Sequence, residues 1–164
     1  MPIQRPCKIL DRRQLTPDVV SLTLDAGEMA RSARPGQFVN VKCGAENLLR
    51  RPISICDAKG DSLRIVFQIK GEGTRWLARR PVGHSGDVLG TLGHGYDYPE
   101  TGRVLVVGGG IGVPPMLHAA KAAPGGAVAA LGYRSRDAVI LTEDFEAAGV
   151  QVKIASDDGS VGHH

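Results

Sequence analysis

The chain has 164 residues, of which 42% are hydrophobic, with 22 glycines, 10 prolines and a formal net charge of +3. This composition excludes a disordered or collagen-like chain, and so many turn-forming residues argue against a long helical bundle. The charge is too small to indicate nucleic-acid binding, and no apolar run approaches the roughly 18 residues of a membrane span. Because the amino-terminal segment also lacks the apolar core of a secretory signal, we expect a cytoplasmic globular protein.

The first hundred residues are typical of short strands separated by turns. The candidate strands are Lys8–Arg13, Val19–Asp25, Gln37–Lys42, Arg51–Cys56, Leu63–Lys70 and Asp87–Leu92. Turn signals such as Arg34-Pro35-Gly36 lie between them, and only Thr74–Arg79 is predicted as a short helix. The pattern predicts a six-stranded antiparallel barrel, which we assign to a domain over residues 1–99.

The pattern changes at residue 100. Val104–Val107 is a continuous apolar run, as expected of a strand that is covered on both faces. The remaining predicted elements are a helix at Val113–Ala123, a strand at Ala127–Tyr133, a helix at Thr142–Ala148 and a strand at Val150–Ala155. This βαβαβ order predicts a partial Rossmann-like domain over residues 100–164.

Gly108–Gly112, with the sequence GGGIG, connects the first of these strands to the helix that follows. A glycine-rich turn at this place lets backbone N–H groups approach a phosphate, and the helix start adds partial positive charge. A tight turn without a ligand is the alternative, but the βαβαβ order favours nucleotide binding. Arg134-Ser135-Arg136-Asp137, after the second strand, combines arginines that would tolerate a 2′-phosphate with a carboxylate. NADH and NADPH both stay open.

Two weaker motifs lie in the predicted barrel. In Arg50–Ile55, the proline at position 52 removes a ladder donor, which favours a strand edge or a barrel mouth. Arg51 could hold a phosphate through two hydrogen bonds, and Ser54 returns to the face of Pro52. Gly71–Thr74 is a compact turn whose N–H groups and hydroxyl could reach a ligand. Taken alone, the first motif is more typical of a solvated arginine pair on an edge strand, and the second is more typical of a plain turn.

The three cysteines, Cys7, Cys43 and Cys56, are odd in number and widely spaced. They predict neither a disulfide framework nor a metal site, and we interpret them as buried thiols. No arrangement of nucleophile and base is present in the sequence, so no catalytic side chain is predicted.

Taken together, the motifs resemble the ferredoxin reductase superfamily and, more narrowly, the electron-transfer subunits of dihydroorotate dehydrogenases. The matching segments are Arg51–Ser54, Gly71–Thr74, Gly86–Gly93, Gly108–Pro115 and Asp157–Ser160. They extend over nearly the whole chain. The resemblance implies a FAD-binding barrel followed by a NAD(P)-binding domain.

The resemblance also implies roles for individual barrel residues. Arg51 would bind the FAD pyrophosphate, and Ser54 would hydrogen-bond near the flavin N5. Pro52 and Ile53 would lie along the flavin. The further contacts that it implies are Gln68, Ile69 and Lys70 through backbone groups, with Gly73 and Thr74 at the pyrophosphate.

For the second domain, the resemblance implies that the glycine turn faces the nicotinamide dinucleotide. The residues concerned are Gly109, Gly110, Ile111 and Gly112. Asp157 and Asp158 would lie near the nicotinamide end, although by themselves they are equally typical of a solvated turn after a strand.

The function implied is transfer of electrons from NAD(P)H through FAD and a [2Fe–2S] cluster to an FMN-containing dihydroorotate dehydrogenase subunit, in pyrimidine biosynthesis. Members of this family are longer and supply a cysteine cluster that this sequence lacks, so we expect a truncated form without the cluster. An incomplete sheet in such a form would favour homo-oligomers through residues such as Val128, Leu131, Val152 and Ile154.

Two alternatives to this function remain open. The chain could be the flavin subunit of a ferredoxin:NADP oxidoreductase, a sulfide dehydrogenase or a sulfhydrogenase, with the same fold and a different partner. It could also be an assembly module without redox activity.

Overall fold

The structure is a computed structural model that describes residues 2–46 and 48–164. The chain forms two compact units, Met1–Gly95 and Tyr96–His164. The second unit includes the extended segment that precedes its first strand, because the Tyr98 hydroxyl donates to the carbonyl of Ala119 at 2.9 Å. Burial of this phenol raises its pKa above the usual value.

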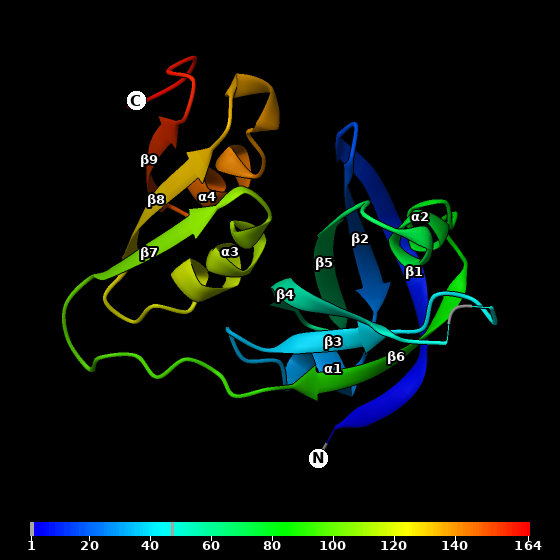
Figure 1. Cartoon of the computed structure of the whole chain (residues 1–164). Coiled ribbons are helices and arrows are strands. Elements are labelled where there is room, and N and C mark those ends of the chain that lie inside the picture. Colours follow the sequence, from blue (N-terminus) through cyan, green and yellow to red (C-terminus); the bar gives the residue numbers. More distant parts are fainter. Residues whose placement is uncertain (1, 47) are drawn as a thin grey trace. The chain divides into compact units, whose positions relative to one another are not determined.

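The first unit is a closed antiparallel barrel of six strands (Figure 1). The strands are β1 (Ile3–Thr16), β2 (Val19–Asp25), β3 (Phe38–Val41), β4 (Arg51–Lys59), β5 (Ser62–Gln68) and β6 (Ser85–Leu92). They follow one another around the barrel in the order β1-β2-β5-β4-β3-β6, and β1 closes it by pairing with β6. The predicted six-stranded barrel is confirmed. Because the barrel closes in this way, neither β1 nor β6 is left as an edge strand.

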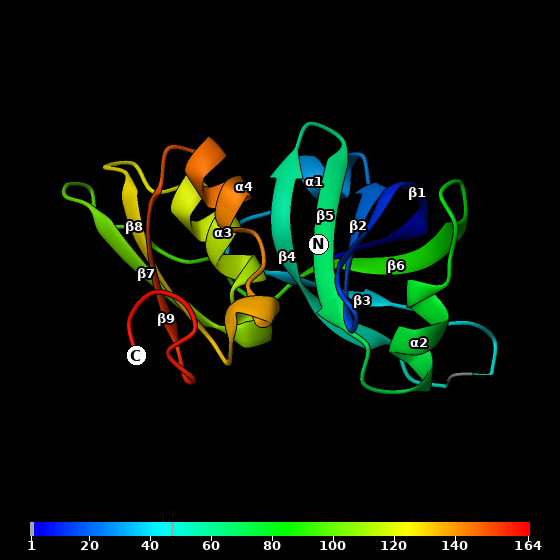
Figure 2. The same cartoon turned by 90° about the horizontal axis from the view of Figure 1, so that it is seen from above.

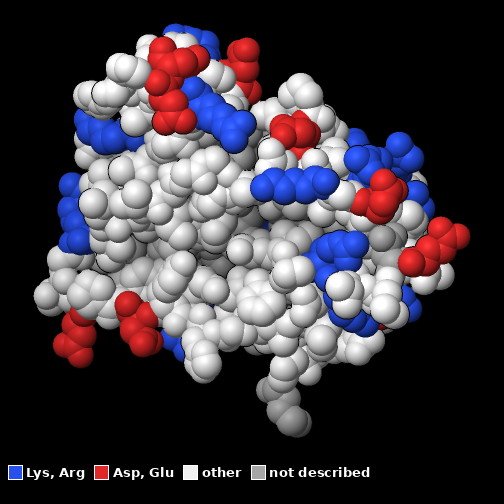
Figure 3. Space-filling model, in the orientation of Figure 1, with Lys and Arg blue, Asp and Glu red and all other residues white. Residues whose placement is uncertain are grey.

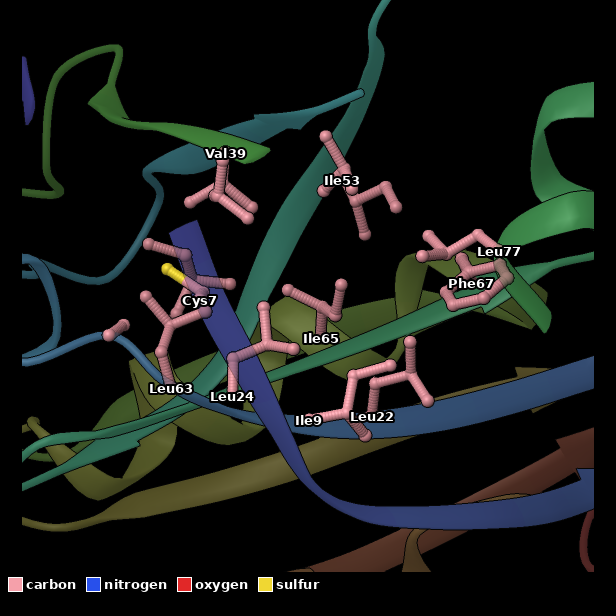
Figure 4. Close-up of a cluster of buried hydrophobic side chains, with 14 of the residues drawn as sticks. Cys7, Ile9, Leu22, Leu24, Val39, Ile53, Leu63, Ile65, Phe67 and Leu77 are labelled. Atoms are coloured by element: carbon pink, nitrogen blue, oxygen red, sulfur yellow. The ribbon is translucent and has the colours of Figure 1, made fainter. Parts of the chain in front are cut away.

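Alternate side chains of these strands fill the barrel interior (Figure 4). On β2, Leu22 and Leu24 point inwards, and on β5, Leu63 and Ile65 do the same. Each such side chain contributes about 1.5–3 kcal/mol through burial, so this cluster is the main source of the barrel's stability. The three cysteines are buried, as predicted. Burial raises the pKa of the Cys7 thiol to about 11.

Two helices accompany the barrel strands. α2 (Glu72–Ala78) lies where the sequence predicts a short helix, and its Leu77 and Ala78 belong to the barrel core. α1 (Glu28–Arg31) was not predicted. It is a single turn that buries Met29 and Ala30, and a segment this short carries no periodic signal in the sequence.

The second unit has the predicted βαβαβ order. Its elements are β7 (Val104–Gly109), a 3₁₀ turn η1 (Gly110–Gly112), α3 (Pro114–Lys121), β8 (Ala127–Tyr133), a 3₁₀ turn η2 (Arg136–Ala138), α4 (Thr142–Ala147) and β9 (Gln151–Ser156). The strands are parallel and lie in the order β7-β8-β9. Within the part of the chain that the structure describes, no helix is long and apolar enough to cross a membrane.

The two faces of this sheet differ. α3 and α4 cover one face, as Figure 2 shows, and Ala129 and Leu131 are buried beneath them. The other face, which we call the bare face, carries the rows Leu105–Val128–Gln151, Val107–Ala130–Lys153 and Gly109–Gly132–Ala155. Leu105 and Val107 are 63% and 66% exposed there.

The bare face corrects one expectation from the sequence. Of the residues expected on an incomplete surface, only Val128 belongs to the bare face. Leu131, Val152 and Ile154 alternate onto the helix-covered face. The apolar surface of this unit is therefore a sheet face bearing Leu105 and Val107, which adjoin the predicted glycine turn.

Candidate functional site

The residues predicted to hold a flavin border a place where two barrel strands part. The ladder between β4 and β5 ends at Ile55 and Ile65. Beyond it, Arg51–Ser54 pairs with β3 only, and residues 66–68 pair with β2 only. We call this place the β4–β5 split. Because β4 needs no ladder donor towards β5 here, it accommodates Pro52, and of the two positions predicted for this proline the strand edge is confirmed.

Arg51 lies against the first turn of α2. A Cβ added to Gly73 would be 2.5 Å from Arg51 Nε and 2.7 Å from its Cζ, closer than real atoms approach. The absence of a side chain at this position therefore makes room for the guanidinium. Arg51 also donates from Nη1 to the carbonyl of Leu49. A planar cation held against a turn in this way is suited to binding a phosphate group.

The side chains of β4 alternate between the outside of the barrel and its core. Pro52 and Ser54 are both exposed on the outward face, as the sequence predicts. Ile53 is only 6% exposed and packs inside the barrel, as Figure 4 shows. The expectation that the Ile53 side chain lies along a flavin is thus corrected, because strand alternation turns it into the core. Its backbone alone borders the β4–β5 split.

Thr74 shapes the turn before α2. Its hydroxyl accepts hydrogen bonds from the N–H groups of Lys70 at 3.0 Å and Gly71 at 3.1 Å. It donates its own proton to the carbonyl of Gly71 at 3.0 Å. The hydroxyl was expected to contact a phosphate directly, but its donor is used within the turn. In this structure it fixes the turn that carries Gly73.

The end of β5 is tied to the turn between β1 and β2. Gln68 donates from Nε2 to the Asp18 carboxylate at 2.5 Å, and Ile69 donates its N–H to the Asp18 carbonyl at 2.7 Å. Ile69 also packs partly against the barrel core. These two donors are therefore used within the barrel.

Arg50 and Arg51, which the sequence presents as a pair, have different environments. Arg50 donates from Nη2 to the Asp87 carboxylate of β6 at 2.6 Å, and from Nη1 to the carbonyl of Asn40 at 3.4 Å. Gln4 of β1 donates to the same carboxylate. These hydrogen bonds, that from Arg50 above all, hold the pKa of Asp87 below its usual value. Arg50 therefore joins strands of the barrel, whereas Arg51 lies at the split.

Trp76 was not singled out from the sequence. Its ring lies 4.3 Å from Arg80 Cζ, and a Cβ on Gly44 would be 3.0 Å from its Nε1. Beside it is a hollow of about 290 Å³ lined by Gly44, Ala45, Glu46 and Trp76. The sequence held one signal that could have drawn attention to this residue: Trp76 is the only tryptophan of the chain, and it follows Gly73 by three residues.

In the second unit, the glycine turn follows β7 and lies on the carboxyl side of the sheet. Gly108 lets α3 pack closely, since a Cβ there would be 3.0 Å from both Val113 Cα and Met116 Cγ. Gly110 has a φ of +51°, a conformation that glycine adopts without strain. Gly109, Ile111 and Gly112 are exposed.

A hollow of about 460 Å³ adjoins this turn on the bare face. Its floor includes Gly109, Gly132 and Ala155, which are neighbours in register on β7, β8 and β9. Lys153 and His163 also line it. The lack of large side chains along this row lets a ligand approach the backbone closely.

The start of α3 offers few N–H donors to a ligand. Its first two residues, Pro114 and Pro115, have no N–H group, and Met116 donates its N–H to the carbonyl of Val113 at 3.0 Å. The first turn of α3 therefore offers no N–H group of residues 114–116 to a phosphate. Donors to a phosphate at this place have to come from the turn Gly109–Gly112.

Asp157 and Asp158 do not adjoin the glycine turn. They follow β9, and β8 lies between β9 and β7. The Asp158 carboxylate accepts hydrogen bonds from Ser160 Oγ at 2.6 Å and Ser160 N at 3.0 Å, which keep its pKa below the usual value. Arg136 donates from Nη2 to the Ser160 carbonyl at 2.6 Å. The segment after β9 is thus joined to the end of β8.

The described residues contain no group of three or more His, Cys, Asp or Glu side chains that could hold a metal ion. No protein-family model matches the chain. The electron transfer subunit of dihydroorotate dehydrogenase B (NAD(+)) from Geobacillus thermodenitrificans is 40% identical over 94% of this chain. The Enterococcus faecalis subunit of the same name is 36% identical over 98% of this chain.

This chain is a homologue of these electron transfer subunits. It spans 63% and 64% of the lengths of the two relatives. The alignment includes both the barrel and the glycine turn, so the resemblance drawn from short motifs extends to the chain as a whole.

Solved structures show the same architecture. The structure of the NADH-dependent reduced ferredoxin-NADP oxidoreductase matches with a TM-score of 0.86 and 28% identity, over 97% of this chain and 59% of that chain. The ferredoxin reductase in carbazole 1,9a-dioxygenase matches with a TM-score of 0.81 and 20% identity, over 99% of this chain and 54% of that one. The chain therefore has the ferredoxin reductase fold, a flavin-binding type of barrel followed by a nucleotide-binding type of domain.

Proposed function

We propose that this chain binds FAD at the β4–β5 split and a nicotinamide dinucleotide at the glycine turn. In this proposal it transfers electrons from NAD(P)H to a catalytic partner, as the electron transfer subunit of a dihydroorotate dehydrogenase. The observation that carries the proposal is 40% identity over 94% of the chain to a subunit of that name. In this proposal the unit Met1–Gly95 binds FAD and the unit Tyr96–His164 binds NAD(P).

The barrel residues fit FAD in both charge and space. Arg51 supplies a cation at the split, and Gly73 leaves it room beside the turn that Thr74 fixes. In this assignment Arg51 and the turn at Gly73 bind the pyrophosphate. Pro52 and Ser54 present the outward face of β4 to the isoalloxazine ring, with the Ser54 hydroxyl near N5. Bound FAD would accept an electron pair from a nicotinamide and release electrons singly.

The second unit fits a dinucleotide through its backbone. The turn Gly109–Gly112 offers N–H groups for a pyrophosphate, and the small residues on the floor of the adjoining hollow let the ligand lie close to the sheet. No side chain of the chain is assigned as an acid or base, because hydride and electron transfer need none. What the protein supplies is binding and orientation.

The finer parts of this proposal concern the complete enzyme. We propose that electrons pass on to a [2Fe–2S] cluster and an FMN-containing dihydroorotate dehydrogenase subunit. We assign no cluster ligand to the three cysteines of this chain, because all three are buried in the barrel unit. The similarity to the ferredoxin-NADP oxidoreductase structure makes a ferredoxin-linked partner the second candidate.

Flavin titration followed by nicotinamide addition tests the proposed chemistry. The purified chain should take up FAD, and anaerobic NADH or NADPH should then bleach the flavin absorbance. An Arg51→Ala variant should bind FAD about tenfold to a hundredfold more weakly, through loss of a charge-assisted contact. Arg50→Ala is the matched control, and should lower the free energy of unfolding rather than the flavin affinity of the folded protein. A chain that takes up no FAD would instead be an assembly module.

The partner is tested separately by co-expression. Dihydroorotate dehydrogenase catalytic subunit and ferredoxin from the same organism would each be offered to the tagged, flavin-loaded protein. Capture of the dehydrogenase, together with dihydroorotate-dependent reduction of NAD(P)+, supports the first candidate. NAD(P)H-dependent reduction of ferredoxin without capture of the dehydrogenase supports the second.

A further inference from the structure

The tryptophan of α2 links two connections on the surface of the barrel unit. Trp76 is half-buried, and a Cβ on Gly44, in the loop between β3 and β4, would be 3.0 Å from its Nε1. The ring of His84, in the turn before β6, lies with its centre 5.6 Å from that of Trp76 and at 74° to it. The loop, the helix and the turn therefore form one continuous surface.

Apolar side chains are exposed on both of these connections. Leu48 in the loop is 95% exposed, and Val82 in the turn is 58% exposed. The hollow of about 290 Å³ beside the ring is lined by Gly44, Ala45, Glu46 and Trp76. An exposed apolar region with a recess of this kind is typical of a site that another molecule covers.

Three arginines lie at the carboxyl end of α2. Arg80 donates from Nε to the Trp76 carbonyl at 3.2 Å, and its Cζ lies 4.3 Å from the centre of the ring. Arg12 of β1 donates from Nε to the Ala78 carbonyl at 2.8 Å. Arg79 follows α2 directly and is exposed. Across residues 2–46 and 48–164, no acid pairs with any of these three guanidinium groups.

The acidic side chains nearby leave this charge in place. Glu72, at the amino end of α2, is paired with Arg75. Glu46 lines the hollow but is exposed, so water and salt screen its carboxylate. On the barrel unit, at the right of Figure 3, Lys and Arg side chains predominate over Asp and Glu. A surface with this charge attracts an acidic partner.

We propose that these residues form a docking surface for an acidic partner protein, which we call the α2 surface. It consists of Arg12, Leu48, Trp76, Arg79, Arg80 and Val82. The partner presents an apolar side chain to the hollow beside the tryptophan and carboxylates to the three arginines. Trp and Arg are among the residues that contribute most to binding at protein interfaces. A phosphate backbone would pair with the arginines but leave the two apolar side chains exposed, so an acidic protein is the better match.

The inference rests on the proposed function for the identity of the partner, which is the catalytic dihydroorotate dehydrogenase subunit. Calorimetric titration of the chain with that subunit from the same organism, in the presence of FAD, measures the interaction. Binding should weaken as the salt concentration rises, because the contact is between opposite charges. Arg79→Glu should lower the affinity at least about tenfold, since a like-charge contact replaces an attraction. Leu48→Asp should lower it about tenfold through loss of buried apolar surface.

Lys59→Glu is the matched control. It makes the same change of charge at an exposed position at the end of β4, and Figure 2 shows the turn between β4 and β5 at the opposite end of the barrel from α2. Its affinity for the catalytic subunit should equal that of the parent chain. All three variants should take up FAD as the parent does, because none of these side chains belongs to the proposed flavin site.

Unchanged affinity in Arg79→Glu and Leu48→Asp would overturn the docking surface and leave the proposed function standing. A parallel loss of FAD uptake in these two variants would assign the hollow to the flavin site and also overturn the docking surface. If the parent chain does not bind the catalytic subunit, the partner in the proposed function and the docking surface both fail, while FAD uptake still tests the barrel. Duplex DNA is offered in parallel, and binding of DNA that Arg79→Glu abolishes would assign the surface to phosphates and overturn the inference.

Discussion

Gly73 illustrates how a glycine can act through a neighbouring side chain. The sequence suggests that its role is to bring the backbone close to a phosphate, whereas the structure shows the Arg51 guanidinium in the space that a Cβ would take. If FAD binds at the β4–β5 split, the glycine is needed because it positions the arginine.

We predict that Gly73→Ala weakens FAD binding about tenfold, because the new methyl group would displace the Arg51 guanidinium from the turn. The free energy of unfolding should not fall, since alanine is the better helix former by about 1 kcal/mol. Flavin fluorescence titration and chemical denaturation measure the two quantities. In the Arg51→Ala background the same change should have little further effect, and additive losses would contradict the coupling.

Asp87 predicts a dependence of stability on acid pH. Its pKa in the folded protein lies below the ordinary value of 3.8, because Arg50 and Gln4 bind the ionised form. The ion pair therefore stabilises the fold above about pH 4, and this contribution is lost as the pH falls below 3.8 through the folded value. The Asp87 side chain is 34% exposed, so the expected size is about 1 kcal/mol or less.

Urea denaturation of the parent chain and of Arg50→Gln, from pH 7 down to pH 2.5, measures this contribution. The difference in unfolding free energy between the two proteins should be largest near neutral pH and should shrink below about pH 4. Arg51→Gln, the neighbouring change, should show no such convergence. A difference that stays constant to the lowest pH would exclude Asp87 as the partner responsible.

The different roles of Arg50 and Arg51 mark how far single residues could be predicted. The sequence correctly placed Pro52 and Ser54 on one face, because alternation along a strand is a local property. It could not separate the two arginines, since what distinguishes them is a carboxylate on β6, 37 residues away. The sequence did not predict that the Thr74 hydroxyl hydrogen-bonds within its own turn. A hydroxyl at this position could equally bond to backbone groups of the turn or to a ligand, and the sequence does not distinguish the two.

At the level of elements, the bare face of the β7-β8-β9 sheet is the least expected feature. Parallel sheets are normally covered on both faces, and the continuous apolar run of β7 predicts burial. In this structure every second residue of that run is exposed. An apolar surface of this kind favours association with other apolar surfaces.

We predict that the chain self-associates through the bare face, and that Val107→Lys makes it monomeric without unfolding it. Val107 is 66% exposed, so a lysine there adds charge to the surface and removes little packing. Light scattering over a dilution series and circular dichroism measure association and folding. Val106→Lys is the contrasting change. Val106 is 5% exposed beneath the helices, so the buried charge should cost several kcal/mol and unfold the unit.

A Val107→Lys protein that associates like its parent would show that the contact lies elsewhere. Loss of stability equal to that of Val106→Lys would show that the face is already covered in solution.

Most elements were predictable because their signals are local. β2 and β8 were predicted with the bounds that the structure shows, as their apolar residues follow a clear pattern between turns. β1 proved much longer than predicted, at 14 residues, because pairing with both β2 and β6 extends it through polar sequence. α1 was missed because it depends on Met29 and Ala30 packing into the barrel.

For the molecule as a whole, the proposed function predicts two separate footprints in amide hydrogen exchange. FAD should slow exchange in residues 51–54 and 66–75, where the β4–β5 split leaves strands without a common ladder. A nicotinamide dinucleotide should slow exchange in residues 108–113. Mass spectrometry of peptic fragments resolves these segments, and β2, whose ladder is complete, serves as the internal control. Protection by FAD confined to residues outside the split would contradict the proposed flavin site.

The topology of both units was predictable, but the positions of some site residues were not. The number of strands, the barrel and the βαβαβ order could be predicted because each strand or helix has its own local pattern of apolar residues and flanking turn residues. The family resemblance implies that Asp157 and Asp158 lie near the nicotinamide end, and this stays a prediction. The order β7-β8-β9 places them two strands away from the glycine turn.

The two prolines at the start of α3 bear on how long a nucleotide stays bound. Pro114 and Pro115 have no N–H group, so a pyrophosphate bound at the glycine turn, as we propose, would have fewer hydrogen bonds to break on release. Since affinity differences between related complexes arise mostly in the dissociation rate, such a site favours short residence times. A coenzyme that leaves after each hydride transfer suits this arrangement. In the proposed function, FAD bound by the Arg51 side chain would remain in place through many such exchanges.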